Sequence, residues 1–110
     1  MVDQTIGFLG AGKMGEAMAR GILRAKLAPA SRVVLSDSDE GRRTAVARSL
    51  AVRVVEDNAA VVEASDVIIV ALKPGVVRHA LPGLAQAIGT EKLVVSIAAG
   101  VTLAELEGML

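Results

Sequence analysis

The sequence of 110 residues contains no cysteine, no tryptophan and no tyrosine, and its single aromatic residue is Phe8. The lack of cysteine excludes disulfides, thiolate metal sites and thiol catalysis, and it fits a reducing compartment, so the cytoplasm is the expected location. The near absence of aromatic rings argues against a protein that binds single-stranded nucleic acid, because such proteins stack bases on aromatic side chains.

An excess of charge of one sign and long apolar runs are missing as well. The 12 basic and 12 acidic residues cancel, so no broad positive field attracts nucleic acid or an anionic membrane. The longest apolar stretch, residues 67–72, is far shorter than a membrane span. We therefore expect no nucleic-acid partner and no membrane partner. With 53% hydrophobic residues, the chain is long enough for one core and too short for two domains, so residues 1–110 are expected to form one domain.

Short apolar runs alternate with segments of helical character along the whole chain. The runs are continuous and rich in β-branched residues, as expected for strands with both faces buried. Each connection is long enough for a crossover between parallel strands. The pattern predicts an α/β fold: a Rossmann-type, doubly wound parallel sheet in the order 3-2-1-4-5, with helices on both faces. The predicted strands are residues 5–9, 32–36, 53–55, 67–72 and 93–97.

The helices are predicted from apolar spacing and from capping residues. Met14, Met18 and Ile22 give the first helix an apolar stripe, which is expected to pack on the sheet. Pro74 is expected to open the fourth helix, and Pro82 to interrupt it. The caps of the other helices are expected at Ser38 or Asp39, at Asp57 or Asn58, and at Thr102.

A glycine-rich turn follows the first predicted strand and leads directly into a helix. Its sequence is Gly10-Ala11-Gly12-Lys13-Met14-Gly15. Backbone N–H groups and the helix dipole would converge here on a pyrophosphate. Gly10 would allow the tight turn, Gly12 the approach of phosphates, and Gly15 close packing of helix on strand. A merely flexible loop is the alternative, but the strand before the turn and the helix after it favour dinucleotide binding.

The end of the second predicted strand is the expected position of the adenosine ribose, about 20 residues beyond the glycine turn. Asp37 could accept hydrogen bonds from a 2′-hydroxyl and would repel a 2′-phosphate. Ser36 and Ser38, with Arg42 and Arg43, could instead accommodate a 2′-phosphate. The two indications conflict. The alternative is that the carboxylates only cap the next helix and that the arginines are solvated.

Two further strand ends carry candidate residues. Lys73, which precedes Pro74, could orient a ribose, a phosphate or an anionic substrate, or be an ordinary surface lysine. The small residues Ala98, Ala99 and Gly100 would let a flat ring approach the backbone, although tight packing would also explain them. The single histidine has no second histidine or cysteine to complete a metal site. We expect neither a metal nor a catalytic side chain.

Four blocks taken together resemble the pyrroline-5-carboxylate reductase family, over nearly the whole chain. They are residues 6–17 (IGFLGAGKMGEA), 57–58 (DN), 71–74 (ALKP) and 96–101 (SIAAGV). The later blocks are more specific than the glycine turn, and their order matches the amino-terminal domain of that family. The resemblance implies an enzyme that uses NADPH or NADH to reduce 1-pyrroline-5-carboxylate, a cyclic imine, to L-proline in proline biosynthesis.

The resemblance also implies which residues meet the cofactor. The glycine turn would hold the pyrophosphate, the second strand end the adenosine ribose, Asn58 the adenosine half, and the last two groups the nicotinamide end. In family members a carboxy-terminal helical domain forms much of the substrate pocket and the dimer. These 110 residues lack that domain, so we expect them to be inactive alone and the full-length protein to be a homo-oligomer. The expected cofactor-binding residues are Gly10, Ala11, Gly12, Lys13, Met14, Gly15, Ser36, Asp37, Asn58, Ala71, Leu72, Lys73, Pro74, Ala98, Ala99 and Gly100.

Other functions are compatible with the same pattern. β-Hydroxyacid and prephenate dehydrogenases have a similar amino-terminal architecture, although residues 96–101 argue against them. A cofactor-binding module without catalytic activity is the alternative from another functional class. A flavodoxin-like or receiver-type domain is disfavoured because the glycine turn follows the first strand, where such domains would carry different residues.

Overall fold

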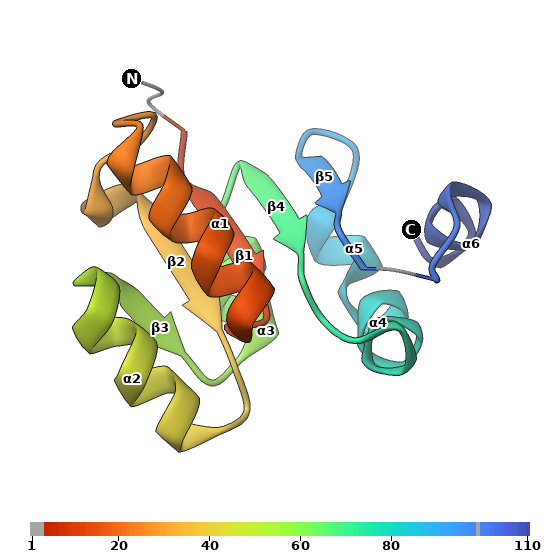
Figure 1. Cartoon of the computed structure of the whole chain (residues 1–110). Coiled ribbons are helices and arrows are strands. Elements are labelled where there is room, and N and C mark those ends of the chain that lie inside the picture. Colours follow the sequence, from red (N-terminus) through yellow and green to blue (C-terminus); the bar gives the residue numbers. More distant parts are fainter. Residues whose placement is uncertain (1–3, 99) are drawn as a thin grey trace.

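One parallel sheet forms the centre of the computed structural model, which describes residues 4–98 and 100–110 (Figure 1). The strand order is β3-β2-β1-β4-β5, and every neighbouring pair is parallel. The predicted doubly wound topology is confirmed, with the reversal of order between β1 and β4. The strands are β1 (Ile6–Leu9), β2 (Val33–Ser36), β3 (Arg53–Val55), β4 (Val67–Val70) and β5 (Leu93–Ser96).

Helices cover both faces of this sheet (Figure 1). Helices α1 and α2 pack on one face, and α3 to α6 contribute to the core on the other. Two short 3₁₀ helices, η1 (Ala30–Arg32) and η2 (Leu81–Leu84), complete the chain path. The α-helices are α1 (Lys13–Arg24), α2 (Glu40–Leu50), α3 (Asn58–Ala64), α4 (Pro74–Ala80), α5 (Ala85–Ile88) and α6 (Leu103–Met109).

The capping residues predicted from the sequence begin these helices. The Asp39 carboxylate accepts the Arg42 N–H at 2.8 Å at the start of α2. Asp57 accepts an N–H in the first turn of α3, and Thr102 forms a capping box at the start of α6. Pro74 is the first residue of α4, and the chain turns into η2 and α5 around Pro82, as predicted.

Two apolar clusters hold the layers together, one on each face of the sheet. Phe8 and Leu35 are fully buried between the sheet and the α1–α2 side. Leu9 and Ile68 are fully buried against the helices of the opposite side. Adjacent residues of β1 therefore enter different clusters, which explains why the strands read as continuous apolar runs.

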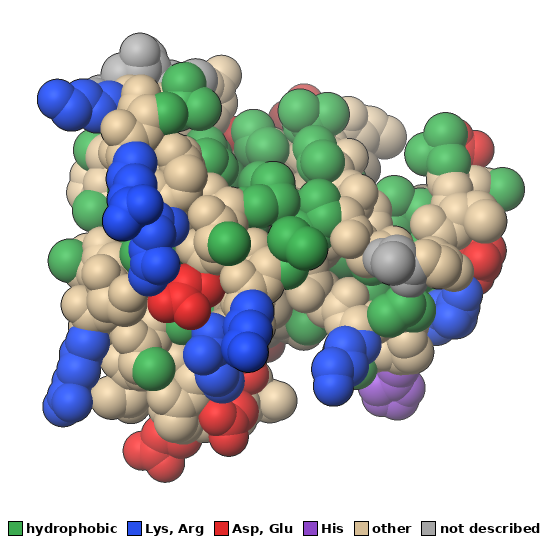
Figure 2. Space-filling model, in the orientation of Figure 1, with side chains coloured by type: hydrophobic (Ala, Val, Ile, Leu, Met, Phe, Trp, Pro, Cys, Tyr) green, Lys and Arg blue, Asp and Glu red, His purple; other side chains and the backbone are tan. Residues whose placement is uncertain are grey.

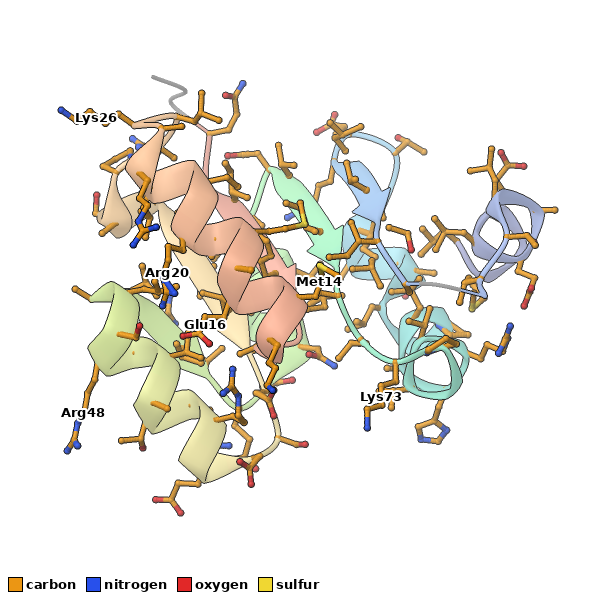
Figure 3. The ribbon with its side chains drawn as sticks, viewed as in Figure 1. Met14, Glu16, Arg20, Lys26, Arg48 and Lys73 are labelled. Carbon is orange, nitrogen blue, oxygen red and sulfur yellow. The ribbon has the colours of Figure 1, made fainter. Side chains whose placement is uncertain are left out.

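The predicted apolar stripe of α1 is wrong at one position. Met18 and Ile22 are partly buried against the core, but Met14 is 62% exposed (Figure 3). Leu93 and Val95 of β5 are exposed too, and Figure 2 shows hydrophobic side chains gathered over β4 and β5. The two helices on this face pack over β1 to β3, which leaves Met14 and the edge strand uncovered within the described residues. None of the helices formed by residues 4–98 and 100–110 is long and apolar enough to cross a membrane.

Candidate functional site

The glycine turn lies where the strand order reverses. The Gly10 N–H donates to the Ser36 carbonyl at 3.0 Å, and the Ala71 N–H donates to the Leu9 carbonyl at 2.9 Å. The carboxyl ends of β1, β2 and β4 therefore meet around Gly10. Beside them is a hollow of about 400 Å³, the central hollow, lined by Gly10, Gly12, Asp37, Ser38, Glu56, Asn58, Ala71, Leu72, Lys73 and Val76.

The three glycines of the turn differ in what the fold requires of them. Gly10 has a positive φ of 104°, and a Cβ there would lie 2.9 Å from the Ala71 carbonyl oxygen. A Cβ on Gly15 would lie 2.5 Å from the Gly10 carbonyl oxygen, so the close approach of α1 needs glycine. A Cβ on Gly12 would meet nothing within 4 Å. The fold therefore tolerates a side chain at Gly12, which would project into open space beside the central hollow.

The amino end of α1 faces this open space. Gly12 is the N-cap residue and provides no side chain to satisfy the N–H groups of the first turn. These N–H groups and the positive end of the helix dipole favour an anion at this end of α1. Lys13 and Met14, both exposed, begin the same turn. This donor set is suited to a pyrophosphate.

Side chains bind both the N–H and the carbonyl of Ala11. The Asp37 carboxylate accepts the Ala11 N–H at 3.2 Å. Arg42 donates to the Ala11 carbonyl oxygen through Nε at 3.1 Å and through Nη2 at 2.8 Å. Helix α2 and the end of β2 thus fix the orientation of the glycine turn. No local sequence signal indicates the contact of Arg42, because 31 residues separate it from Ala11.

Asp37 lies at the centre of the turn between β2 and α2. Besides the Ala11 N–H, its carboxylate accepts the Asp39 N–H at 2.9 Å. Arg43 donates through Nη1 to the Asp37 and Ser38 carbonyl oxygens, each at 3.0 Å. Asp39 is the helix cap, and Asp37 instead points to the glycine turn and lines the central hollow. The suggestion that both carboxylates only cap the helix is wrong for Asp37.

Ser36 and Asn58 are hydrogen-bonded to each other beside the central hollow. Ser36 is fully buried, and its hydroxyl donates to the Asn58 amide oxygen at 2.5 Å. Asn58 is the first residue of α3 and lines the central hollow. The two predicted residues are therefore in contact, and only Asn58 lines the central hollow.

The other wall of the central hollow follows β4. Ala71, Leu72 and Lys73 line it, and Lys73 is exposed (Figure 3). Gly100 has a positive φ of 82°, and a Cβ there would lie 3.8 Å from Cγ of Pro74, so the segment after β5 approaches this wall. Ala98 is partly buried against the core, and Ala99 lies outside the described residues.

Arg78 ties the segment after β5 to α4. Its guanidinium donates to the Gly100 carbonyl at 2.8 Å and to the Glu105 carboxylate at 2.8 Å. The hydrogen bond from Arg78 and that from the Thr102 backbone hold the pKa of Glu105 below its ordinary value. The same pair raises the pKa of Arg78. Both side chains are exposed, so water screens the attraction.

Seven of the predicted residues line the central hollow. Three lining residues were absent from the predicted set: Ser38, Glu56 and Val76. Glu56 directly follows β3, and could have been found because the carboxyl ends of all parallel strands share one edge. The predicted residues that line the hollow are Gly10, Gly12, Asp37, Asn58, Ala71, Leu72 and Lys73. The other described members of the predicted set are not part of its lining: Ala11, Lys13, Met14, Gly15, Ser36, Pro74, Ala98 and Gly100.

A second hollow, of about 450 Å³, lies at the opposite edge of the sheet and contains none of the predicted residues. Its lining includes Asp66 and Lys92. The Lys92 ammonium donates to the Val62 and Ser65 carbonyls at the end of α3. This arrangement satisfies helix carbonyls and is explained by the fold.

Comparisons with known proteins identify relatives over nearly the whole chain. Residues 5–100 match the family model described as NADP oxidoreductase, coenzyme F420-dependent. The whole chain is 42% identical to a pyrroline-5-carboxylate reductase of Methanosarcina acetivorans and covers 41% of it. A structure of pyrroline-5-carboxylate reductase from Coxiella burnetii has a TM-score of 0.91 at 24% identity over 99% of this chain and 40% of that one, which supports the fold. The Plasmodium falciparum pyrroline carboxylate reductase, solved with NADP bound, has a TM-score of 0.84 at 26% identity over 99% of this chain and 38% of that one.

The chain thus spans about two fifths of the length of these relatives. The resemblance indicated by the four sequence blocks is confirmed by identity over the full chain. The chain belongs to the NADP oxidoreductase family described as coenzyme F420-dependent, and it is similar to pyrroline-5-carboxylate reductases over its full length.

Proposed function

We propose that this chain is the NAD(P)H-binding domain of a pyrroline-5-carboxylate reductase. The observation that carries the proposal concerns Gly12. Packing does not require glycine at this position, and the absence of a side chain leaves room at the amino end of α1. A glycine that packing does not require, in a turn beside a hollow, is suited to the close approach of phosphates.

The remaining predicted residues have positions that fit the other parts of a dinucleotide. Asp37 and Asn58 lie on the β2–β3 side of the central hollow, where the adenosine half would bind. Ala71, Leu72 and Lys73 lie on the β4 side, where the nicotinamide end would bind. Ser36 would act through Asn58, and Arg42 through the peptide of Ala11.

The reaction proposed for the complete protein is reduction of 1-pyrroline-5-carboxylate to L-proline, the final step of proline biosynthesis. The bound nicotinamide would supply the hydride for the imine carbon. The residues of this chain would hold the cofactor in register and keep water from its reacting end, since apolar atoms of Ala71 and Leu72 form that wall. No side chain of this domain is assigned as proton donor.

In the complete protein, the substrate pocket and the oligomer interface would include residues of the region that this chain does not cover in its relatives. The full-length protein would be a homo-oligomer, and residues 1–110 would form one cofactor-binding domain with little or no reductase activity alone. The cytoplasm is the proposed location, because the chain has no cysteine and the reaction uses a reduced nucleotide.

The test is titration of NADH and NADPH into the 110-residue chain, followed by nicotinamide fluorescence or calorimetry, in the wild type and in Gly12→Ala. We expect saturable binding of at least one nucleotide by the wild type. The substitution should leave the unfolding midpoint nearly unchanged and weaken binding about tenfold or more, because the new methyl group occupies the phosphate position.

Gly21→Ala is the matched control, because its added Cβ would also meet nothing within 4 Å but lies on an exposed part of α1. It should bind like the wild type. Absence of saturable binding by the wild type, or equal binding by Gly12→Ala, would rule out the proposed site.

A further inference from the structure

Two arginines stand beside the proposed ribose position, and both already donate to backbone carbonyls. Arg42 contacts the Ala11 carbonyl through two nitrogens, at 3.1 and 2.8 Å. Arg43 donates to the Asp37 and Ser38 carbonyls at 3.0 Å each. Guanidinium groups are the usual ligands of a ribose 2′-phosphate, so their existing partners bear directly on which dinucleotide the site takes.

The contact of Arg42 belongs to a larger network between α1 and α2. Nη2 of Arg42 lies 3.1 Å from the Glu16 carboxylate, which also accepts from Arg20 at 3.2 Å. Arg20 in turn donates to the Ser49 hydroxyl at 2.6 Å, and Figure 3 shows Arg20 and Glu16 on the side of α1 that faces α2. Moving Arg42 to a 2′-phosphate would break both donations to the glycine turn and its ion pair with Glu16.

The charges that line the hollow on this side are negative. Asp37 and Glu56 follow β2 and β3, whereas the lysine of the lining, Lys73, follows β4 on the other side. The two oxygens of Asp37 accept the Ala11 and Asp39 N–H groups, and each carboxylate oxygen can accept a second hydrogen bond. Asp37 can therefore accept a ribose hydroxyl in its present position, but it would repel a phosphate.

We propose that the site selects NADH over NADPH. Asp37 is the specificity-determining residue, and Arg42 positions the glycine turn and does not contact a 2′-phosphate. This inference rests on the proposed function, since it concerns the same hollow. It resolves the conflict that the sequence alone presents between Asp37 and the two arginines.

The first measurement is the ratio of the dissociation constants of NADH and NADPH for the wild-type chain. We expect NADH to bind about tenfold more tightly or better, because a phosphate beside a carboxylate is strongly disfavoured. Equal affinities, or tighter binding of NADPH, would overturn the selectivity while leaving the proposed function intact. Failure of both nucleotides to bind would overturn the proposed function, and the selectivity with it.

Two variants separate the roles of the side chains. Asp37→Ser should shift the ratio of the two dissociation constants toward NADPH, even if the loss of the contact with the Ala11 N–H weakens the binding of both nucleotides. An unchanged ratio would contradict the role of Asp37. Arg42→Ala should weaken both nucleotides by the same factor, so that their ratio stays that of the wild type. A loss confined to NADPH would show that Arg42 binds the 2′-phosphate and would overturn the assignment.

Arg48→Ala is the matched control for Arg42→Ala. Arg48 lies on the same helix, is exposed, and points away from α1 in Figure 3. It should change neither affinity. The readout of Arg42→Ala is the ratio of the two dissociation constants. General loosening of the fold would weaken the binding of both nucleotides and leave this ratio unchanged, so it does not imitate a specific loss of NADPH binding.

Discussion

The Ser36 hydroxyl oxygen lies 2.5 Å from the Asn58 amide oxygen and joins the end of β2 to the start of α3. Because the hydroxyl is the donor, the Asn58 amide is held with its oxygen toward Ser36 and its NH₂ group directed elsewhere. A buried side chain that cannot itself reach solvent thereby orients one that lines the central hollow.

Ser36→Ala should remove this orientation with little change in volume. Loss of the buried hydrogen bond is expected to lower the free energy of unfolding by about 1 kcal/mol. Dinucleotide affinity should fall a few-fold, because the Asn58 amide can rotate. Urea unfolding and nucleotide titration measure the two effects. Ser31→Ala, at an exposed position of η1, is the control and should alter neither. Affinity equal to that of the wild type would contradict a role for Ser36 in the site.

Gly7→Ala should be among the most destabilising substitutions in the sheet. A Cβ there would lie 2.0 Å from Oγ of Ser65 and 2.6 Å from Cγ1 of Val61, both in buried side chains of α3 and its end. Overpacking of this kind costs about 1–3 kcal/mol or more in urea unfolding. Adding Ser65→Gly should recover part of the loss, because the nearest clash disappears. A Gly7→Ala protein as stable as the wild type would contradict the close packing of β1 on α3.

The fold was accessible from the sequence because its signals are local. Apolar runs, capping residues and the glycine turn each act over a few residues, and the topology follows from crossover lengths and handedness. The contact of Arg42 with Ala11 could not be predicted, since it depends on how α2 returns to β1. The exposure of Met14 was missed for the same reason, because the helical period does not say which part of a sheet lies beneath each turn.

The candidate site was predictable to a similar extent. The edge of the sheet and most of the residues that line the hollow follow from strand order, whereas the contact between Ser36 and Asn58 depends on how α3 lies against the end of β2. Glu56 was missed although its position after β3 puts it at the same edge. Asp37 and Asp39 looked equivalent as caps, and only the backbone of the turn separates their roles.

The Arg78–Glu105 pair predicts a pH dependence of the contact between α4 and α6. Because folding lowers the pKa of Glu105, its contribution is complete above the ordinary pKa of glutamate and is lost as the pH falls through the folded value. The effect is small because both side chains are exposed. Acidification should therefore lower the protection of the α6 amides, measured as exchange rates relative to those of an unfolded chain at the same pH, and Glu105→Gln should reduce this loss of protection. Identical acid responses of the two proteins would contradict the contribution of the pair.

Lys92→Met should destabilise the end of α3. The ammonium donates to the Val62 and Ser65 carbonyls, and methionine keeps the apolar stem but removes both donations. A loss of about 1–3 kcal/mol in urea unfolding is expected, as for hydrogen bonds from a charged donor. Lys26→Met, at an exposed position after α1, is the control and should have a much smaller effect. Equal losses for the two variants would show that the carbonyl contacts contribute nothing.

The amide proton of Gly10 can be used to follow the contact between β1 and β2. This N–H donates across the centre of the sheet to the Ser36 carbonyl, and the residue is buried between the ends of β2 and β4. Opening this bond requires β1 and β2 to separate at their carboxyl ends, so we expect the Gly10 amide to exchange more slowly than the other amides of the glycine turn. In a two-dimensional spectrum, the backbone resonance of the first residue of the glycine turn would then report how firmly the two central strands are held together.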